Sequence, residues 1–222
     1  MAGVLAQFKE RERKMSKIFQ KIDDKLLRLI NKTLNNGGVI VFPTETVYAL
    51  AADPADDEAV ARIYELKGRD KCKPLSLLVG DMYQASQVVE LNEVAEKLAM
   101  RFFPGPLTIV LNKKPGGNLS KLVNSANDKI GIRMPSHVLT LKILKAFGRP
   151  IIGTSANVSG FNNDAIDPFK VIESFRDVDL MVNLGKTEHQ KFSTVVDATG
   201  PKIEILREGV ISKETIFKAL EE

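Results

Sequence analysis

The chain has 222 residues, of which 44% are hydrophobic and 27% are charged, the composition of a globular protein with enough apolar side chains for a full core. A single cysteine, Cys72, excludes an intramolecular disulfide and a cysteine-based metal site, and no apolar run approaches the roughly 18 residues that a membrane-spanning helix needs. We therefore expect a cytoplasmic protein, whose formal net charge of +4 suits anionic ligands such as nucleotides or RNA.

The first 17 residues form a basic stretch ahead of the first regular pattern. Apolar residues precede its charges, which is the reverse of a secretory signal, and Glu10 and Glu12 argue against a transit peptide. We interpret residues 1–17 as an N-terminal extension and residues 18–222 as one folded domain.

Short apolar runs alternate with helical patterns along the rest of the chain. Leucine and isoleucine at helical spacing between residues 26 and 34 predict a first helix, capped by Asp23 or Asp24 and ended by Gly37-Gly38. The elements expected after it are a strand at 39–42, a helix at 56–66, a strand at 75–79, a helix at 92–103, strands at 107–111 and 129–134, a helix at 136–147, a strand at 150–153, a helix at 168–176, strands at 179–183, 193–197 and 202–206, and a helix from 213.

This order predicts a single α/β domain, with a twisted mixed parallel/antiparallel sheet flanked by helices, because the last three strands follow one another without a helix between them. Polar loops follow the strand ends, where open α/β sheets bind ligands.

Four cations, Lys67, Arg69, Lys71 and Lys73, occupy every second position ahead of the strand at 75–79. If this segment is extended, as Pro74 favours, all four side chains project from one side. Like charges packed so closely repel one another unless an anion lies among them, so the pattern indicates polyphosphate binding. A solvated surface run is the alternative.

Polar side chains also stand at strand ends. Thr46 follows the strand at 39–42, Arg133 ends the strand at 129–134 and suits a bidentate grip on a carboxylate, and Ser193 and Arg207 lie at boundaries of later strands. Ordinary turn and surface roles are the alternatives for these residues.

Residues 153–157 read GTSAN, one residue short of the G-x-S-x-G elbow that carries a hydrolase nucleophile. A nucleophilic Ser155 needs a base, and the only histidines are His137 and His189, neither in a favourable context. Ser155 and Asn157 are better explained as donors and acceptors for a ligand. The chain has no P-loop pattern and no metal-ligand spacing, so we expect no protein-ligated metal.

In order, the segments FPTETVYAL, KGRDKCKPLSLLV, FPGPLTIVL, KIGIRMPSH, PIIGTSANVSG, STVVD and ILREG resemble the YrdC-like family of threonylcarbamoyl-AMP synthases, in its short single-domain form. The resemblance implies that residues 18–222 are a YrdC-like catalytic domain. It implies a nucleotidyltransferase that makes L-threonylcarbamoyladenylate and pyrophosphate from L-threonine, bicarbonate and ATP, with Mg²⁺ accompanying ATP. The product would pass to a downstream tRNA threonylcarbamoyl transferase machinery that modifies adenosine 37 of tRNA, and weak tRNA binding is a further expectation.

The resemblance also gives roles to individual residues. It implies that Thr46, Arg133 and Ser193 bind L-threonine. It implies that Lys67 and Arg69 are catalytic, and that the ATP site consists of Lys67, Arg69, Lys73, Lys129, Ser155, Asn157 and Arg207. Ala49 departs from the glycine that the family usually has, and we expect it to crowd the pocket. Asp70 departs from the family's proline, and we expect its charge to weaken phosphate binding.

Two other interpretations stay open. A non-catalytic RNA-binding module would explain the positive charge and the cationic run, but not the hydroxyl and amide side chains at strand ends. A carbamoyl-phosphate-related maturation domain shares this fold and normally lies inside a much larger chain.

Overall fold

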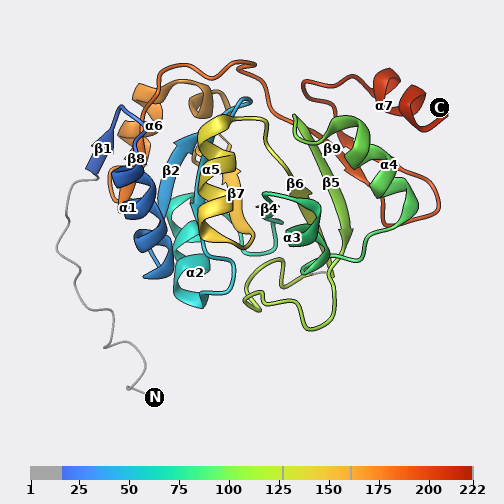
Figure 1. The fold of residues 1–222 in the computed structure, drawn as a ribbon, viewed down its shortest axis with the longest axis horizontal. Coiled ribbons are helices and arrows are strands. Elements are labelled where there is room, and N and C mark those ends of the chain that lie inside the picture. The colour runs from blue at the N-terminus through green and yellow to red at the C-terminus, as the bar shows by residue number, and fades with distance from the viewer. Residues whose placement is uncertain (1–16, 127, 161, 222) are drawn as a thin grey trace.

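The computed structural model describes residues 17–126, 128–160 and 162–221, which form one mixed ten-stranded sheet flanked by helices (Figure 1). The strand order is β1-β8-β2-β3-β7-β4-β6-β5-β9-β10. The strands are β1 (Lys17–Phe19), β2 (Ile40–Pro43), β3 (Tyr48–Ala52), β4 (Ser76–Leu78), β5 (Leu107–Asn112), β6 (Lys129–Arg133), β7 (Ile151–Ser155), β8 (Leu180–Val182), β9 (Thr194–Asp197) and β10 (Glu204–Arg207). Pairs such as β4–β6 and β5–β9 are parallel, whereas β3–β7 and β5–β6 are antiparallel. The predicted fold class is confirmed.

Helices cover both faces of the sheet. They are α1 (Asp24–Asn35), α2 (Asp57–Leu66), α3 (Met82–Ser86), α4 (Glu93–Phe102), α5 (Val138–Phe147), α6 (Pro168–Ser174) and α7 (Lys213–Glu221), with a 3-10 turn at Asn162–Ile166. Apolar residues of α1 and α5 pack with Ile40 and Phe42, whereas Val39 and Val41 belong to a second core cluster with α2 and α4. Since successive strand residues point to opposite faces, the two clusters lie on opposite sides of the sheet.

Acidic or amide side chains cap the start of most of the helices, although His137 at the start of α5 makes no such bond. The carboxylate of Asp23 accepts a hydrogen bond from the Leu26 amide at 2.7 Å, and Asp56 does the same for Ala59 at 2.9 Å. Each cap satisfies an amide that has no partner inside the helix, which fixes the helix start. The predicted first two helices are therefore confirmed, including the capping role of Asp23.

Strands β1 and β3, helix α3 and the 3-10 turn are absent from the sequence prediction. Residues 48–52 form β3, a central strand that pairs with β2 and β7, although the sequence suggested a polar stretch. Its YALAA sequence lacks alternation and has no β-branched residue, so only its pairing on both sides makes it a strand. Helix α3 is also additional and has only five residues.

The first residues that the structure describes lie at the edge of the sheet. Lys17–Phe19 forms β1 and pairs in parallel with β8, so Lys17, which we assigned to the extension, belongs to the sheet. Residues 1–16 of that predicted extension lie outside the described residues. Within 17–126, 128–160 and 162–221, no helix combines the length and the apolar character that crossing a bilayer requires.

Candidate functional site

A cavity of about 680 Å³ lies on one face of the sheet, where β7, β4, β6, β5 and β9 are neighbours. Alternate residues of these strands line it, for example Thr108 and Val110 of β5 and Gly131 and Arg133 of β6. The sequence predicts a site at the strand ends, but much of the cavity extends over the face of the sheet itself.

Two strand glycines lie in the floor of this cavity. A Cβ atom at Gly153 would lie 2.2 Å from Cγ of Leu78, and one at Gly131 would lie 2.9 Å from Oγ of Ser76. Because neither position has room for a side chain, the backbone of β6 and β7 forms part of the floor.

All but one of the predicted site residues line this cavity. They are Thr46, Arg69, Lys73, Lys129, Arg133, Ser155, Asn157, Ser193 and Arg207. They come from segments as distant in sequence as the loop after β2 and the end of β10, so the fold brings together what the sequence kept apart. Lys67 is the exception.

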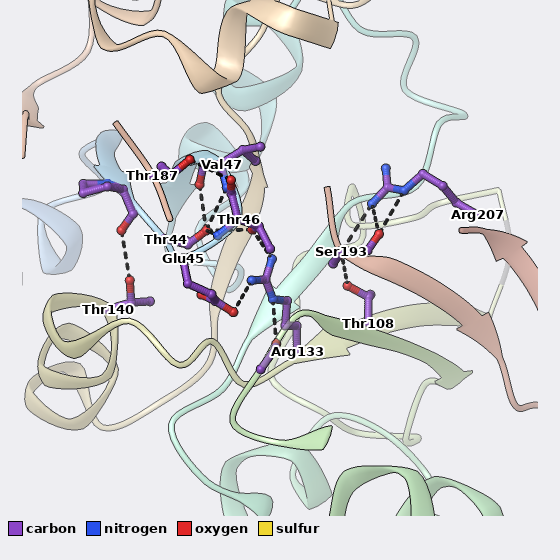
Figure 2. Close-up of polar contacts among 12 residues, drawn as sticks. Thr44, Glu45, Thr46, Val47, Thr108, Arg133, Thr140, Thr187, Ser193 and Arg207 are labelled. Carbon is purple, nitrogen blue, oxygen red and sulfur yellow. Dashed lines mark hydrogen bonds and ion pairs between the residues drawn. The ribbon is translucent and has the colours of Figure 1, made fainter. Parts of the chain in front are cut away.

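Arg133 is a buried arginine that the structure holds by three hydrogen bonds (Figure 2). Its Nε donates to the carbonyl of Gly105 at 3.1 Å, Nη1 donates to Oγ1 of Thr46 at 2.7 Å, and Nη2 donates to Oε1 of Glu45 at 2.5 Å. A guanidinium has five N–H groups, so two remain for a ligand in the cavity.

The hydroxyl of Thr46 keeps one position for a ligand. Its Oγ1 accepts from Arg133 at 2.7 Å and lies 2.9 Å from Oγ1 of Thr44, which can itself donate to the carbonyl of Val47 at 2.7 Å. A hydroxyl has one proton and two lone pairs. When Thr46 donates to Thr44, its remaining lone pair can accept from a ligand.

Ser193 joins two other cavity residues. Its Oγ lies 2.9 Å from Oγ1 of Thr108, and Nη2 of Arg207 donates to its carbonyl oxygen at 3.0 Å (Figure 2). Burial lowers the pKa of Arg207, and the like charge of Arg133 adds to the shift. An anion bound within reach of both guanidinium groups would offset that repulsion.

Positive charge dominates the lining of the cavity. The cations that line it are Arg69, Lys73, Lys129, Arg133 and Arg207. Asp197 is the only carboxylate among the described lining residues, and it pairs with Lys129 at 2.9 Å. The cavity is therefore suited to a ligand with more than one negative charge.

The expectation that Lys67, Arg69, Lys71 and Lys73 form one extended cationic row is wrong. Helix α2 ends at Leu66, Gly68 has φ of +53°, and the Lys73 amide bonds back to the carbonyl of Asp70, so the segment turns. Arg69 and Lys73 line the cavity, whereas Lys71 is exposed and does not.

Lys67 is 1% exposed and lies beneath the loop that follows β7. Its ammonium donates to the carbonyl oxygens of Ser155 and Asn157, and its own carbonyl accepts from the amide of Ser159. Burial, together with the charge of Arg69, lowers the pKa of Lys67 to about 7. In this structure Lys67 therefore holds the Ser155–Ser159 loop in shape.

The hydroxyl of Ser155 is not hydrogen-bonded to a base, since the nearby amine of Lys67 donates to backbone carbonyls instead. The Ser155 hydroxyl donates to Oδ1 of Asn157, and neither His137 nor His189 is among the residues that line the cavity. Oδ1 of Asn157 is thus engaged within the loop, and Nδ2 donates to the carbonyl of Val158 at 2.9 Å. Both residues fit the binding interpretation.

The two departures from the family pattern lie outside the cavity. Ala49 packs in the cluster that contains Phe42 and does not line the cavity, so the expected crowding does not occur. Asp70 is exposed and accepts a hydrogen bond from the Cys72 amide at 2.8 Å, again away from the cavity lining.

Some residues of the site were not found from the sequence. Thr108 and Asp197 line the cavity from within predicted strands, and Asn124 lines it from the loop after β5. The side chain of Asn124 bonds to both the amide and the carbonyl of Leu75, at 2.6 and 3.1 Å. The alternation of side chains along each strand predicts two faces of the sheet, but only the packed sheet shows which face carries the cavity.

Comparisons with known proteins identify the family of this chain. The family model named for Sua5, YciO and YrdC, described as "Telomere recombination", matches residues 32–209. A Methanocaldococcus jannaschii protein named "Putative threonylcarbamoyl-AMP synthase" is 36% identical over 191 residues, which is 84% of this chain and 87% of the relative. The threonylcarbamoyl-AMP synthase of Pyrococcus abyssi is 34% identical over 204 residues, 91% of this chain, but the match spans only 59% of that longer protein.

Solved structures give the same result. The crystal structure of P. abyssi Sua5 complexed with L-threonine has a TM-score of 0.86 at 33% identity and matches 93% of this chain and 61% of that chain. Escherichia coli YciO has a TM-score of 0.81 at 27% identity, with 91% and 100% covered. From sequence and structure together, the chain belongs to the Sua5–YciO–YrdC family, the YrdC-like family of threonylcarbamoyl-AMP synthases.

Proposed function

We propose that this protein is a nucleotidyltransferase that forms L-threonylcarbamoyladenylate and pyrophosphate from L-threonine, bicarbonate and ATP. The observation that carries the proposal is one cavity in which a buried arginine with two free N–H groups lies among further cations. Relatives over most of this chain are named as threonylcarbamoyl-AMP synthases, and one of them was solved with L-threonine.

The amino-acid site we propose uses Arg133, Thr46 and Ser193. Two N–H groups of Arg133 are available for a carboxylate, and Oγ1 of Thr46 is available to accept from an ammonium or hydroxyl group. An α-amino acid carries its ammonium and its carboxylate on the same carbon atom, so one molecule can satisfy both residues. Ser193 adds a hydroxyl next to Arg207.

The nucleotide site we propose consists of Arg69, Lys73, Lys129, Ser155, Asn157 and Arg207, with Lys67 supporting its loop. The threonine nitrogen adds to the carbon of bicarbonate, releasing water and a proton, and gives a carbamate. A carbamate oxygen then attacks the α-phosphorus of ATP, and the bond to pyrophosphate breaks with its electrons going to the pyrophosphate oxygen. The cations stabilise the charge that develops on phosphate oxygens during this step.

Mg²⁺ fits this site as a companion of ATP. Asp197 is the only carboxylate among the described lining residues, and Lys129 already pairs with it. Mg²⁺ prefers oxygen ligands and commonly binds through substrate phosphates and water with one or two carboxylates. We propose that it enters with the triphosphate, whose charge it would partly neutralise.

Pyrophosphate release tests the proposed reaction. Purified protein is given ATP and Mg²⁺, and L-threonine and bicarbonate are added and omitted one at a time. We expect release that requires both. Release that is independent of threonine, or no release from folded protein under any combination, would contradict the proposal and favour a binding role, which a steep salt dependence of RNA binding would then support.

The partners we propose follow from the product. An acyl adenylate of this kind is a reactive donor of the threonylcarbamoyl group. We expect a cytoplasmic tRNA threonylcarbamoyl transferase machinery to receive it and to transfer this group to tRNA. The test is transfer of label from L-threonine to tRNA, which should need this protein, ATP and the transferase together. Direct binding to tRNA is expected to be weak.

Lys67 should report nucleotide binding through proton uptake. Its pKa of about 7 leaves it mostly neutral at pH 8, partly because Arg69 is charged nearby. Bound triphosphate would offset Arg69 and raise the pKa of Lys67, so the protein should take up a fraction of one proton. Calorimetry at pH 8 in buffers of different ionisation enthalpy measures this uptake. Lys67→Met should abolish it and Lys71→Met should not; equal uptake in both would assign the proton to another group.

Ser155→Ala should separate binding from nucleophilic catalysis. The change removes a hydroxyl and its bond to Asn157, so we expect the KM for ATP to rise about fivefold while measurable turnover remains. Steady-state pyrophosphate release gives both constants. Complete loss of turnover with unchanged ATP affinity would instead identify Ser155 as a nucleophile.

A further inference from the structure

We propose that Glu45 is the positioning residue of the amino-acid site: it acts through Arg133, holding the guanidinium in the orientation that presents two N–H groups to the substrate carboxylate. The inference rests on the proposed function for the identity of the amino acid. Glu45 itself does not line the cavity.

The carboxylate of Glu45 is buried beside the guanidinium of Arg133 (Figure 2). The side chains of Glu45 and Arg133 are 2% and 8% exposed, and their charged atoms lie 2.5 Å apart. At this depth neither charge is solvated, so each depends on the other, and removing one leaves a buried uncompensated charge. This distinguishes the pair from the other ion pairs of the described residues, all of which include a more exposed side chain.

The loop that carries Glu45 is itself held in place. Oγ1 of Thr44 accepts from the amides of Thr46 and Val47, which closes a tight turn around Glu45. The carbonyl of Glu45 accepts from the His189 amide at 2.8 Å, and Oγ1 of Thr187 donates to the carbonyl of Thr46 at 2.7 Å. The position of the Glu45 carboxylate is therefore set by segments on both sides, as an orienting group requires.

Glu45 also sets the charge balance near Arg133. Arg133 and Arg207 carry like charges, whose repulsion adds to the desolvation that lowers the pKa of Arg207, and Arg207 is held through Ser193. The groups that face Glu45 are Arg133 and His137, and burial keeps the pKa of His137 low despite Glu45 and Glu188 nearby. A neutral His137 leaves Arg133 as the charge that Glu45 compensates. With the charge of Arg133 balanced by Glu45, the site suits an amino acid, whose carboxylate and ammonium charges cancel.

The experiment compares Glu45→Ala and Glu45→Gln in pyrophosphate release and in calorimetric binding of L-threonine. Glu45→Ala removes the acceptor, so we expect the threonine KM and Kd to rise about tenfold or more, with kcat at saturating threonine within about threefold and the ATP KM unchanged. Glu45→Gln keeps an oxygen that accepts from Nη2, so it should recover much of the affinity. If the Ala variant does not fold, Glu45→Asp takes its place: it keeps the charge but withdraws the acceptor by one methylene, so the threonine KM should still rise while kcat changes little.

A double-mutant cycle tests whether Glu45 acts through Arg133. If it does, Glu45→Ala should cost little further threonine affinity in an Arg133→Lys background, because the geometry that Glu45 maintains is already lost. Asp53→Asn is the control, since Asp53 is 7% exposed, pairs with Arg149 at 2.5 Å and does not line the cavity. It should lower the melting temperature without changing the threonine KM.

Additive losses in the cycle, or an unchanged threonine KM in folded Glu45→Ala, would overturn the positioning role. So would parallel changes in threonine KM, ATP KM and kcat. These outcomes are separable from failure of the proposed function: wild-type protein that binds threonine but releases no pyrophosphate would refute the reaction and still allow the calorimetric comparison. Wild-type protein that does not bind threonine would refute both.

Discussion

Arg69→Ala should lower kcat/KM for ATP in pyrophosphate release by at least about tenfold. The guanidinium of Arg69 lines the cavity, where Nη2 donates to the carbonyl of Pro74 at 3.0 Å and Nε is buried without a partner. A charge-assisted bond to a phosphate oxygen would satisfy Nε and stabilise the charge that builds up in the transition state. Alanine removes both the charge and the donors.

Lys71→Ala provides a matched control for Arg69→Ala. Lys71 is two residues away in the same turn and carries the same charge, but it is exposed and does not line the cavity. It should leave kcat/KM within about twofold, because exposed charges contribute little through solvent. Equal losses in the two variants would mean that the turn acts through its overall charge and not through Arg69.

Arg133→Lys should raise the threonine KM by about tenfold or more while the ATP KM changes little. Lysine keeps the positive charge, so Glu45 stays paired, and the substitution avoids the cost of an isolated buried carboxylate. An ammonium cannot reproduce three bonds to Gly105, Thr46 and Glu45 and still offer two parallel donors. A rise in the threonine KM would therefore report the loss of the planar guanidinium and not a loss of charge.

Arg149→Lys is the corresponding control, since Arg149 pairs with the carboxylate of Asp53 away from the cavity. It should leave the threonine KM unchanged. If Arg133→Lys also left the KM unchanged, the carboxylate contact would belong to another residue, and Arg207 would be the first candidate because it lies within electrostatic reach of Arg133.

Local patterns in the sequence predicted most of the fold. Capping by Asp23 and the helical spacing after it depend only on neighbouring residues, so they predicted α1 correctly. The strand β3 could not be predicted in this way, because YALAA becomes a strand through its pairing with β2 and β7. Parallel and antiparallel pairs were anticipated, but which strands are neighbours depends on the whole chain.

The candidate site was predicted less completely. Chemistry at single positions, such as a strand-end arginine or a run of cations, identified most of the predicted site residues, and the resemblance added Lys129 and the roles of the others. The predicted position of Lys67 was wrong. Alternation places side chains in one row only where the backbone is extended, and the chain turns at Gly68, which has a positive φ. In the sequence Glu45 is one carboxylate between two threonines, and nothing local connects it with Arg133, 88 residues away.

The glycine floor of the cavity has a consequence for how this protein can change its substrates. Where Gly131 and Gly153 stand, the boundary of the cavity is the hydrogen-bonded ladder itself, and a larger residue collides with side chains of β4 or β5. At these two positions the depth of the cavity is therefore tied to the integrity of the sheet. The bordering loops, such as those carrying Thr46 and Arg69, are the parts of the cavity whose sequences can vary while the sheet stays paired.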